Sequence, residues 1–156
     1  MGLLKEDFCE KIGKGALLSV SNGEKCNTMT VSWGGCGILW GKEVCFVFVR
    51  PQRYTYTFTE TSNIFSLSFF GDEKKDTLSY CGTKSGRDVD KFKECGLEYT
   101  CENGAVVFKD AKKTIILKKL YSNTLSEHGF LSEKELSFYK SGDYHKMYIC
   151  EIIKVL

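Results

Sequence analysis

Residues 44–50 read Val-Cys-Phe-Val-Phe-Val-Arg, a nearly continuous apolar run that decides the fold class. β-Branched and aromatic residues in so short a run are typical of a buried strand, so we expect it in the core of a barrel. Short segments of similar composition, punctuated by glycines, surround it. These further expected strands are residues 15–21, 29–33, 37–40, 64–70, 114–120 and 146–155.

Helical patterns are fewer and shorter than the strand patterns. Residues 54–61 follow Pro51, which suits the first turn of a helix, and residues 74–81 and 89–95 also show helical spacing. Gly96 is a natural helix stop, and Asn22-Gly23 is a natural turn. The sequence therefore predicts a mainly β fold, a closed or partly closed antiparallel barrel with peripheral helices, because closure removes exposed sheet edges.

Length and composition indicate one soluble domain. The 156 residues contain no linker, repeat or low-complexity run, so we expect a single domain over residues 1–156. The net charge of +2 gives no strong field, and we expect neither a nucleic-acid nor a membrane partner. Charged residues interrupt the apolar run that a signal peptide needs, so a cytoplasmic protein is expected.

The cysteine pattern argues against a structural metal site. The chain has eight cysteines and two histidines, and no Cys-x-x-Cys spacing. We therefore expect no bound metal, and we expect most of the thiols to be reduced and to pack as small apolar side chains.

Residues 27–34, Asn-Thr-Met-Thr-Val-Ser-Trp-Gly, place polar side chains at alternate positions. In a strand Thr28, Thr30 and Ser32 share one face, where they can bond the edge of a flat polar ring. The alternative is a Thr-rich strand with a solvated face.

Residues 50–55, Arg-Pro-Gln-Arg-Tyr-Thr, stand where the buried strand ends and a helix begins. Two guanidinium groups, a hydroxyl and helix N-terminal amides meet there, which is one way to bind a phosphate. The alternative is a polar loop with exposed arginines.

Two further segments contain residues that suit a binding site. Residues 81–92 place glycines beside hydroxyl and basic side chains, and Asp88 is expected to cap the following helix. In residues 142–148, His145 opens the last strand after a Gly-Asp turn and can face a ligand. The alternatives are an ordinary capped loop and a structural histidine.

Taken in order, these motifs resemble the flavin reductase-like family, and within it the flavoredoxin-type proteins. The motifs are N-x-M-T-x-S-W, R-P-x-R-Y-T, S-F-F-G, C-G-x-x-S-G-x-D-x-D-K-F and G-D-x-H, from about Ser19 to Ile153. The resemblance implies a Greek-key-like split β-barrel that binds FMN and forms a homodimer. Glu43 and Cys150 depart from the family pattern, which has proline and glycine there.

The resemblance also implies which residues surround FMN. One group lines the isoalloxazine ring, a second holds the phosphate and ribityl chain, and a third closes the site. These groups are Asn27, Thr28, Met29, Thr30, Ser32 and Trp33; Arg50, Arg53, Tyr54 and Thr55; and Cys81, Ser85, Gly86 and Asp88.

The function expected from this resemblance is FMN-dependent electron transfer. The flavin ring supplies the chemistry, so no acid or base residue is required, and His145 is only a candidate for contacting a nicotinamide or a partner. The alternatives are an NAD(P)H:flavin oxidoreductase with FMN as an exchangeable substrate, a one-electron carrier between redox proteins, and a barrel that binds another ligand or partner. The chain has no G-x-G-x-x-G motif, so any nicotinamide is expected to bind transiently.

Overall fold

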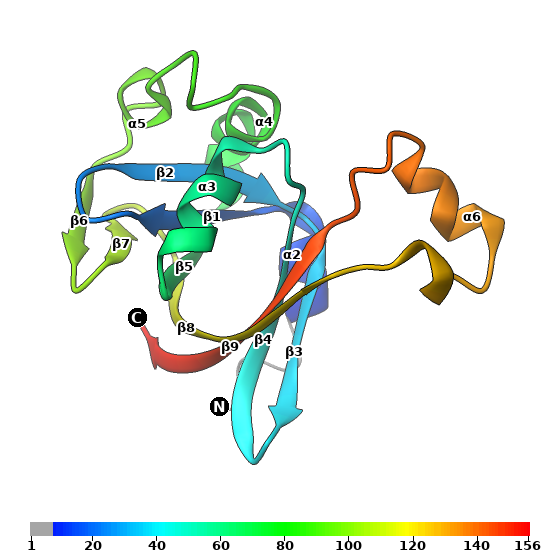
Figure 1. Cartoon of the computed structure of the whole chain (residues 1–156). Helices are drawn as coiled ribbons and strands as arrows, with labels where there is room; N and C mark the ends of the chain where they lie inside the picture. The colour runs from blue at the N-terminus through cyan, green and yellow to red at the C-terminus, as the bar shows by residue number, and fades with distance from the viewer. Residues whose placement is uncertain (1–7) are drawn as a thin grey trace.

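The computed structural model describes residues 8–156, and a curved antiparallel sheet dominates it (Figure 1). Its seven strands follow the order β2-β1-β5-β8-β9-β4-β3, and every neighbouring pair is antiparallel. The strands are β1 (Ala16–Ser21), β2 (Cys26–Val31), β3 (Gly34–Leu39), β4 (Lys42–Val49), β5 (Ile64–Phe69), β8 (Lys113–Thr124) and β9 (Lys146–Val155). The predicted mainly β fold is confirmed, and the central run extends from residue 42 to residue 49.

The barrel is split between β2 and β3. These two strands form the edges of the sheet, although only Ser32 and Trp33 separate them in the chain. Within residues 8–156 no ladder joins the two edges, so the sheet curls round without closing. After β4 the chain passes through α3 (Tyr54–Thr61) and returns in β5 beside β1, which is a Greek-key-like connection.

Tight turns with positive φ form two of the hairpins. Trp40 (φ 53°) and Gly41 (φ 70°) join β3 to β4, so Trp40 lies in the turn and not in the strand that the sequence predicts. Asn103 (φ 52°) and Gly104 (φ 83°) join β6 (Tyr99–Glu102) to β7 (Ala105–Phe108), a small second sheet that the sequence analysis missed. The predicted turn at residues 22 and 23 is confirmed, with the amide of Lys25 donating to Asn22 Oδ1 at 2.8 Å.

The helices are short and lie around the barrel. Residues 54–61 form α3 as predicted, whereas the predicted helix 89–95 shortens to one turn. The residue that caps this turn is Asp90 and not Asp88, because the Asp90 carboxylate accepts the Lys93 amide at 3.1 Å. Gly96 (φ 59°) follows that turn as expected. This one-turn helix is α5 (Lys91–Glu94), and the other helices are α2 (Phe8–Lys14), α4 (Lys75–Thr83) and α6 (Glu133–Leu136), with 3-10 turns η1 (Asp72–Lys74), η2 (Glu127–Gly129) and η3 (Ser137–Tyr139).

Two hydrophobic clusters form the core. The larger fills the barrel and includes Val47, Val49 and Phe65, all 3% exposed or less. The smaller contains Leu17, Cys81, Leu97, Val106 and Phe108, between β1, α4 and the β6–β7 hairpin. Burial of large apolar side chains at this level is the main source of stability for a domain of this size.

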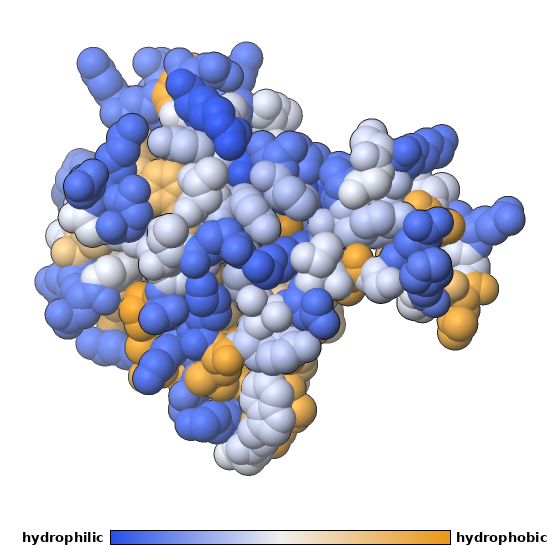
Figure 2. Space-filling model, in the orientation of Figure 1, coloured by the Kyte–Doolittle hydropathy of each residue, from blue (hydrophilic) through white to orange (hydrophobic). Residues whose placement is uncertain are grey.

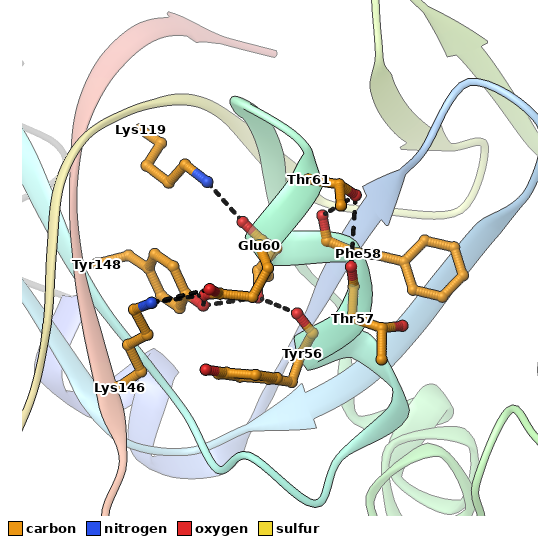
Figure 3. A network of polar contacts seen from close by, with 9 residues as sticks. Tyr56, Thr57, Phe58, Glu60, Thr61, Lys119, Lys146 and Tyr148 are labelled. Atoms are coloured by element: carbon orange, nitrogen blue, oxygen red, sulfur yellow. Dashed lines mark hydrogen bonds and ion pairs between the residues drawn. The ribbon is translucent and has the colours of Figure 1, made fainter.

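The C-terminal end of α3 is fixed by a polar network (Figure 3). The Glu60 carboxylate accepts bonds from Lys146 Nζ at 2.9 Å and from the Tyr148 hydroxyl at 2.6 Å. Lys119 Nζ donates to the Thr59 carbonyl at 2.7 Å, and the Thr59 and Tyr148 hydroxyls lie 2.8 Å apart. Because these partners come from β8 and β9, the network sets the direction in which the opposite end of α3 points.

An arm connects β8 to β9 and carries α6. Figure 1 shows it standing away from the barrel, and Figure 2 shows hydrophobic surface at its tip. Leu131 and Phe138 of this arm are exposed. Among the helices of residues 8–156, none is long and apolar enough to cross a membrane.

Candidate functional site

Two cavities follow one another along β2. The first, of about 370 Å³, is the His145 cavity, and the second, of about 700 Å³, is the Lys91 cavity. The His145 cavity is lined by Met29, Thr30, Val31, Ser32, Trp33, Phe48, Arg50, Arg53 and His145. The Lys91 cavity has Cys26, Asn27, Tyr54, Gly86, Arg87, Asp88, Lys91 and Tyr99 in its wall, with others. Together they offer an elongated site, and both volumes lie in the range typical of ligand pockets.

The start of α3 lies between the two cavities. Arg53 lines the His145 cavity, and the next residue, Tyr54, lines the Lys91 cavity. The Asn27 amide donates to the Thr55 hydroxyl at 2.9 Å, which joins β2 to the first turn of this helix. Among the described residues no side chain caps that turn. Helix N-terminal amides attract anions, so the junction of the cavities suits a negative group.

The two arginines of the His145 cavity are held in place. Arg50 Nη1 donates to the Asp143 carboxylate at 2.6 Å, and Arg50 Nη2 donates to the Phe138 carbonyl at 3.0 Å. Arg53 Nη2 donates to the Cys81 carbonyl at 3.3 Å, and burial lowers the pKa of Arg53. The Asp143 carboxylate offsets much of the Arg50 charge, so Arg53 is the stronger candidate for contacting an anion.

His145 is buried and neutral at pH 7. Its Nδ1 lies 2.7 Å from the Tyr139 hydroxyl, and its ring packs 5.3 Å from that of Trp33 and 6.3 Å from that of Phe48. Burial lowers the pKa of His145 to about 4, and the charge of Arg50 acts in the same direction. His145 directly precedes β9, as expected, and forms part of an aromatic wall without adding charge.

Lys91 is a candidate site residue that the sequence analysis quoted within a motif but did not assign to the site. It is 2% exposed, and its Nζ donates to the carbonyls of Thr28 and Cys81, each at 2.9 Å. Burial lowers the pKa of Lys91 to about 8, with Arg53 acting in the same direction, so the ammonium stays largely charged at neutral pH. An ammonium has three N–H groups, and these two bonds use two of them.

Gly86 provides a close approach in the Lys91 cavity. A Cβ at this position would overlap the Asn27 amide and lie 2.9 Å from Cδ1 of Tyr54. Beside it, the Arg87 guanidinium lies over the Tyr54 ring, 4.9 Å from the centroid. The absence of a side chain at Gly86 therefore lets the 81–92 segment pack directly on β2 and α3.

The structure brings most of the residues predicted to surround a cofactor into these two cavities. Six of the predicted residues line the His145 cavity: Met29, Thr30, Ser32, Trp33, Arg50 and Arg53. Four others line the Lys91 cavity: Asn27, Tyr54, Gly86 and Asp88. Among the described lining residues, neither cavity includes Thr28, Thr55, Cys81 or Ser85. Ligand contact by any of these residues stays a prediction.

The strand face predicted to meet a ring edge is partly occupied by other contacts. The buried Thr28 hydroxyl bonds that of Ser19 at 2.8 Å, and the Thr30 hydroxyl donates to the Leu78 carbonyl at 2.5 Å. Thr28 and Thr30 therefore share the face of β2 that points away from the barrel core, where Thr28 contacts β1 and Thr30 contacts α4 at the cavity wall. Ser32 lies beyond the end of β2, so the expected alternation stops before it.

Cys81 has its side chain in the core, contrary to the idea that this side chain closes the site. It is 0% exposed and packs in the smaller hydrophobic cluster, while its carbonyl accepts bonds from Arg53 and Lys91. Cys81 thus acts on the site through its backbone. Within the described residues no group of three or more His, Cys, Asp and Glu side chains is placed to hold a metal ion.

Comparison with known proteins identifies the fold. No family model and no curated protein sequence matches the chain. Solved structures do match: flavoredoxin from Methanosarcina acetivorans is 21% identical, with a TM-score of 0.70, 91% of this chain and 67% of that chain covered. An FMN-binding domain of a flavin reductase-like enzyme from Shewanella baltica is 17% identical, with a TM-score of 0.70, 99% and 70% covered.

The chain has the split-barrel fold of the flavin reductase-like proteins. An NADH:FAD oxidoreductase from Streptomyces globisporus shares this fold at 12% identity, with a TM-score of 0.70, 91% and 73% covered. At these identities the likeness establishes the split-barrel fold alone. The function has to be inferred from the residues that line the two cavities.

Proposed function

We propose that the chain binds one FMN along β2 and transfers electrons through it. The observation that carries this proposal is the sequence of two cavities along one strand, the first walled by aromatic side chains and the second containing a buried ammonium. A flavin mononucleotide has the same division between a flat ring and a phosphate. The neighbours named as flavoredoxin and FMN-binding domain support the choice of ligand.

In this proposal the His145 cavity holds the isoalloxazine ring. Trp33, Phe48 and Met29 supply apolar surface for the flat ring, and β2 supplies backbone groups for its polar edge. His145 stays neutral, so it can hydrogen-bond the ring without imposing a charge on it. When bound, the flavin ring supplies reversible electron and hydride transfer, while the protein sets its position and electrostatic surroundings.

The phosphate is assigned to the side of the site where cations and helix amides meet. Lys91 has an N–H left beyond its two carbonyl bonds, and the uncapped start of α3 lies beside it. Arg53 stands between the two cavities and adds a guanidinium. These groups fit an anionic phosphate better than they fit a neutral ribityl end.

The alternatives differ in how the flavin is used. An NAD(P)H:flavin oxidoreductase would exchange FMN as a substrate, and the NADH:FAD oxidoreductase neighbour supports this possibility. A one-electron carrier would instead exchange electrons with a redox protein. A barrel that binds another ligand or partner would lack flavin altogether.

Flavin binding and donor specificity test the proposal together. A charge-assisted phosphate bond contributes about 1.5–3 kcal/mol, so FMN should bind at least about tenfold more tightly than riboflavin. Equal affinity for FMN and riboflavin would overturn the phosphate assignment, and a colourless chain that titrates with neither would overturn the flavin proposal. NADH or NADPH bleaching of the bound flavin would identify the oxidoreductase.

We also propose that two copies associate through the exposed apolar surface beside the site. Trp33 and Phe138 are each about half exposed (48% and 53%), and their rings pack 5.4 Å apart where the arm meets the His145 cavity. Trp40 (59% exposed) extends the apolar surface at the opposite end of β3. Aromatic side chains are enriched at subunit contacts, and a two-fold dimer would bury the same patch twice. Light scattering of the FMN-bound protein should give twice the 17.7 kDa of one chain, and a monomer with flavin bound would contradict the dimer.

A further inference from the structure

Two cysteines from distant parts of the chain meet beside the Lys91 cavity. The thiols of Cys26, at the start of the edge strand β2, and Cys101, in β6, are neighbours: burial raises the pKa of the Cys26 thiol, and the Cys101 thiol acts in the same direction. The Tyr99 hydroxyl lies beside the Cys26 thiol as well. Tyr99 and Cys101 are two residues apart on one strand and so share a face, which accounts for both reaching Cys26.

Cys26 and Cys101 differ from the buried cysteines in their access to solvent. Cys101 is exposed and Cys26 is partly exposed. Cys45 and Cys150, which are opposite each other on β4 and β9, are fully buried, and burial raises the pKa of each to about 12. Buried thiols of that kind are chemically inert. An exposed thiol can react with a disulfide, and a second thiol beside it can then displace the attached group and form a protein disulfide.

We propose that Cys26 and Cys101 are a redox-active thiol pair that forms a disulfide between β2 and β6 on reaction with low-molecular-weight disulfides. The Cys101 thiolate attacks one sulfur of the small disulfide, and the first small thiolate leaves. The Cys26 thiolate then attacks the Cys101 sulfur, breaks the mixed disulfide and releases the second small thiolate. Two protein thiols lose two electrons and two protons, and one small disulfide becomes two small thiols.

The bond would join the two sides of the Lys91 cavity. Cys26 and Tyr99 both line it, and Cys26 directly precedes Asn27, whose amide bonds α3. The disulfide would close a long loop, from residue 26 to residue 101, and would restrain the β6–β7 hairpin against the edge of the main sheet. It should therefore slow the exchange of a ligand held in this cavity, a consequence that rests on the proposed function.

Oxidised glutathione is the probe for the disulfide. Peptide mapping without reductant should find Cys26 joined to Cys101, and Tm should rise by roughly 5–10 °C, reversibly with dithiothreitol. The rise should be absent in Cys101→Ser and kept in Cys9→Ser, the matched control at an exposed cysteine on α2. A persistent glutathione adduct on Cys101, a disulfide at other cysteines, or no loss of thiols would overturn the proposal.

FMN release gives a separate readout. The oxidised protein should release FMN at least about twofold more slowly than the reduced protein, because the disulfide restrains the cavity wall. Equal release rates with the disulfide mapped would overturn the link to the cavity. Absence of FMN binding in both forms would count against the proposed function and leave the mapped disulfide standing.

Discussion

The two ends of α3 contrast in how their polar groups are satisfied. At the C-terminal end Glu60, Lys146, Tyr148 and Thr59 bond one another, and Lys119 closes the group (Figure 3). At the N-terminal end no described side chain caps the helix, and the first turn lies between two cavities. A helix fixed at one end and open at the other is a rigid support with donors left for a ligand.

The contrast also separates charges that support the fold from charges that suit binding. Lys146 and Glu60 neutralise each other at 2.8 Å, and so do Arg50 and Asp143 at 2.6 Å. The Lys91 ammonium donates to two neutral backbone carbonyl groups, so its positive charge is hydrogen-bonded but not cancelled by these partners. We expect changes near Lys91 to affect FMN binding and changes near Glu60 to affect stability.

Gly86→Ala should have the largest effect, at the open end of α3. The added Cβ would overlap the Asn27 amide and break its bond to Thr55, which moves β2 away from the first turn. Overpacking of this kind costs about 1–3 kcal/mol in stability, and we expect FMN affinity to fall at least about tenfold as well. Flavin fluorescence titration and urea unfolding measure the two effects.

Gly129→Ala is the matched control, since a Cβ there meets nothing within 4 Å. It should leave FMN affinity within about twofold of the original value. Unchanged affinity in Gly86→Ala would show that the contact of the 81–92 segment with β2 does not shape the binding site.

The neutral His145 predicts a pH dependence of stability. Its pKa in the folded chain is lowered to about 4, mainly by burial, so the unfolded chain takes up the proton first as the pH falls. The stability that the neutral His145 contributes to the fold is complete above about pH 6.5 and decreases as the pH falls from 6.5 to 4. We expect this group to remove about 2 kcal/mol of stability between pH 7 and pH 5.

Paired histidine variants isolate that contribution from the titration of carboxylates. In urea unfolding, His145→Asn should lose this part of the pH dependence, whereas His128→Asn, at the exposed second histidine, should keep it. Identical slopes between pH 5 and 7 in the two variants would show that the His145 imidazole is accessible to protons in the folded state.

The sequence predicted the scaffold better than the cavities. Residues 54–61 were predicted as a helix because Pro51 and the end of an apolar run mark its start, and the strand run 44–50 was recognisable from its composition. The β6–β7 hairpin was missed, although Asn103-Gly104 is a recognised hairpin signal. The second strand, Ala105–Phe108, is apolar throughout, whereas the first, Tyr99–Glu102, is exposed at all four residues and has no buried face to mark it.

The missed site residues have a different cause. Lys91 stands in a charged segment, and lysines are rarely buried, so nothing local indicates that its ammonium is buried against two carbonyl groups. Its one signal is its place in the D-K-F end of the family motif. The alternation of Thr28 and Thr30 correctly indicated a strand, but which hydroxyl meets a cavity depends on α4 and β1, which are packed against it. Both the burial of Lys91 and the contacts of the threonine hydroxyls depend on residues that are distant in the sequence and packed against them in the fold.

Tyr148→Phe should have the smallest effect and should leave binding intact. Glu60 would keep Lys146, and the Thr59 hydroxyl would keep its bond to the Tyr56 carbonyl, so no group is left unpaired by the lost hydroxyl. We expect a loss of about 1 kcal/mol in the free energy of unfolding, measured in urea, with FMN affinity within about twofold of the original. If FMN affinity instead fell tenfold at this distance, the network at the closed end of α3 would be positioning the cavities and the two ends would act as one unit.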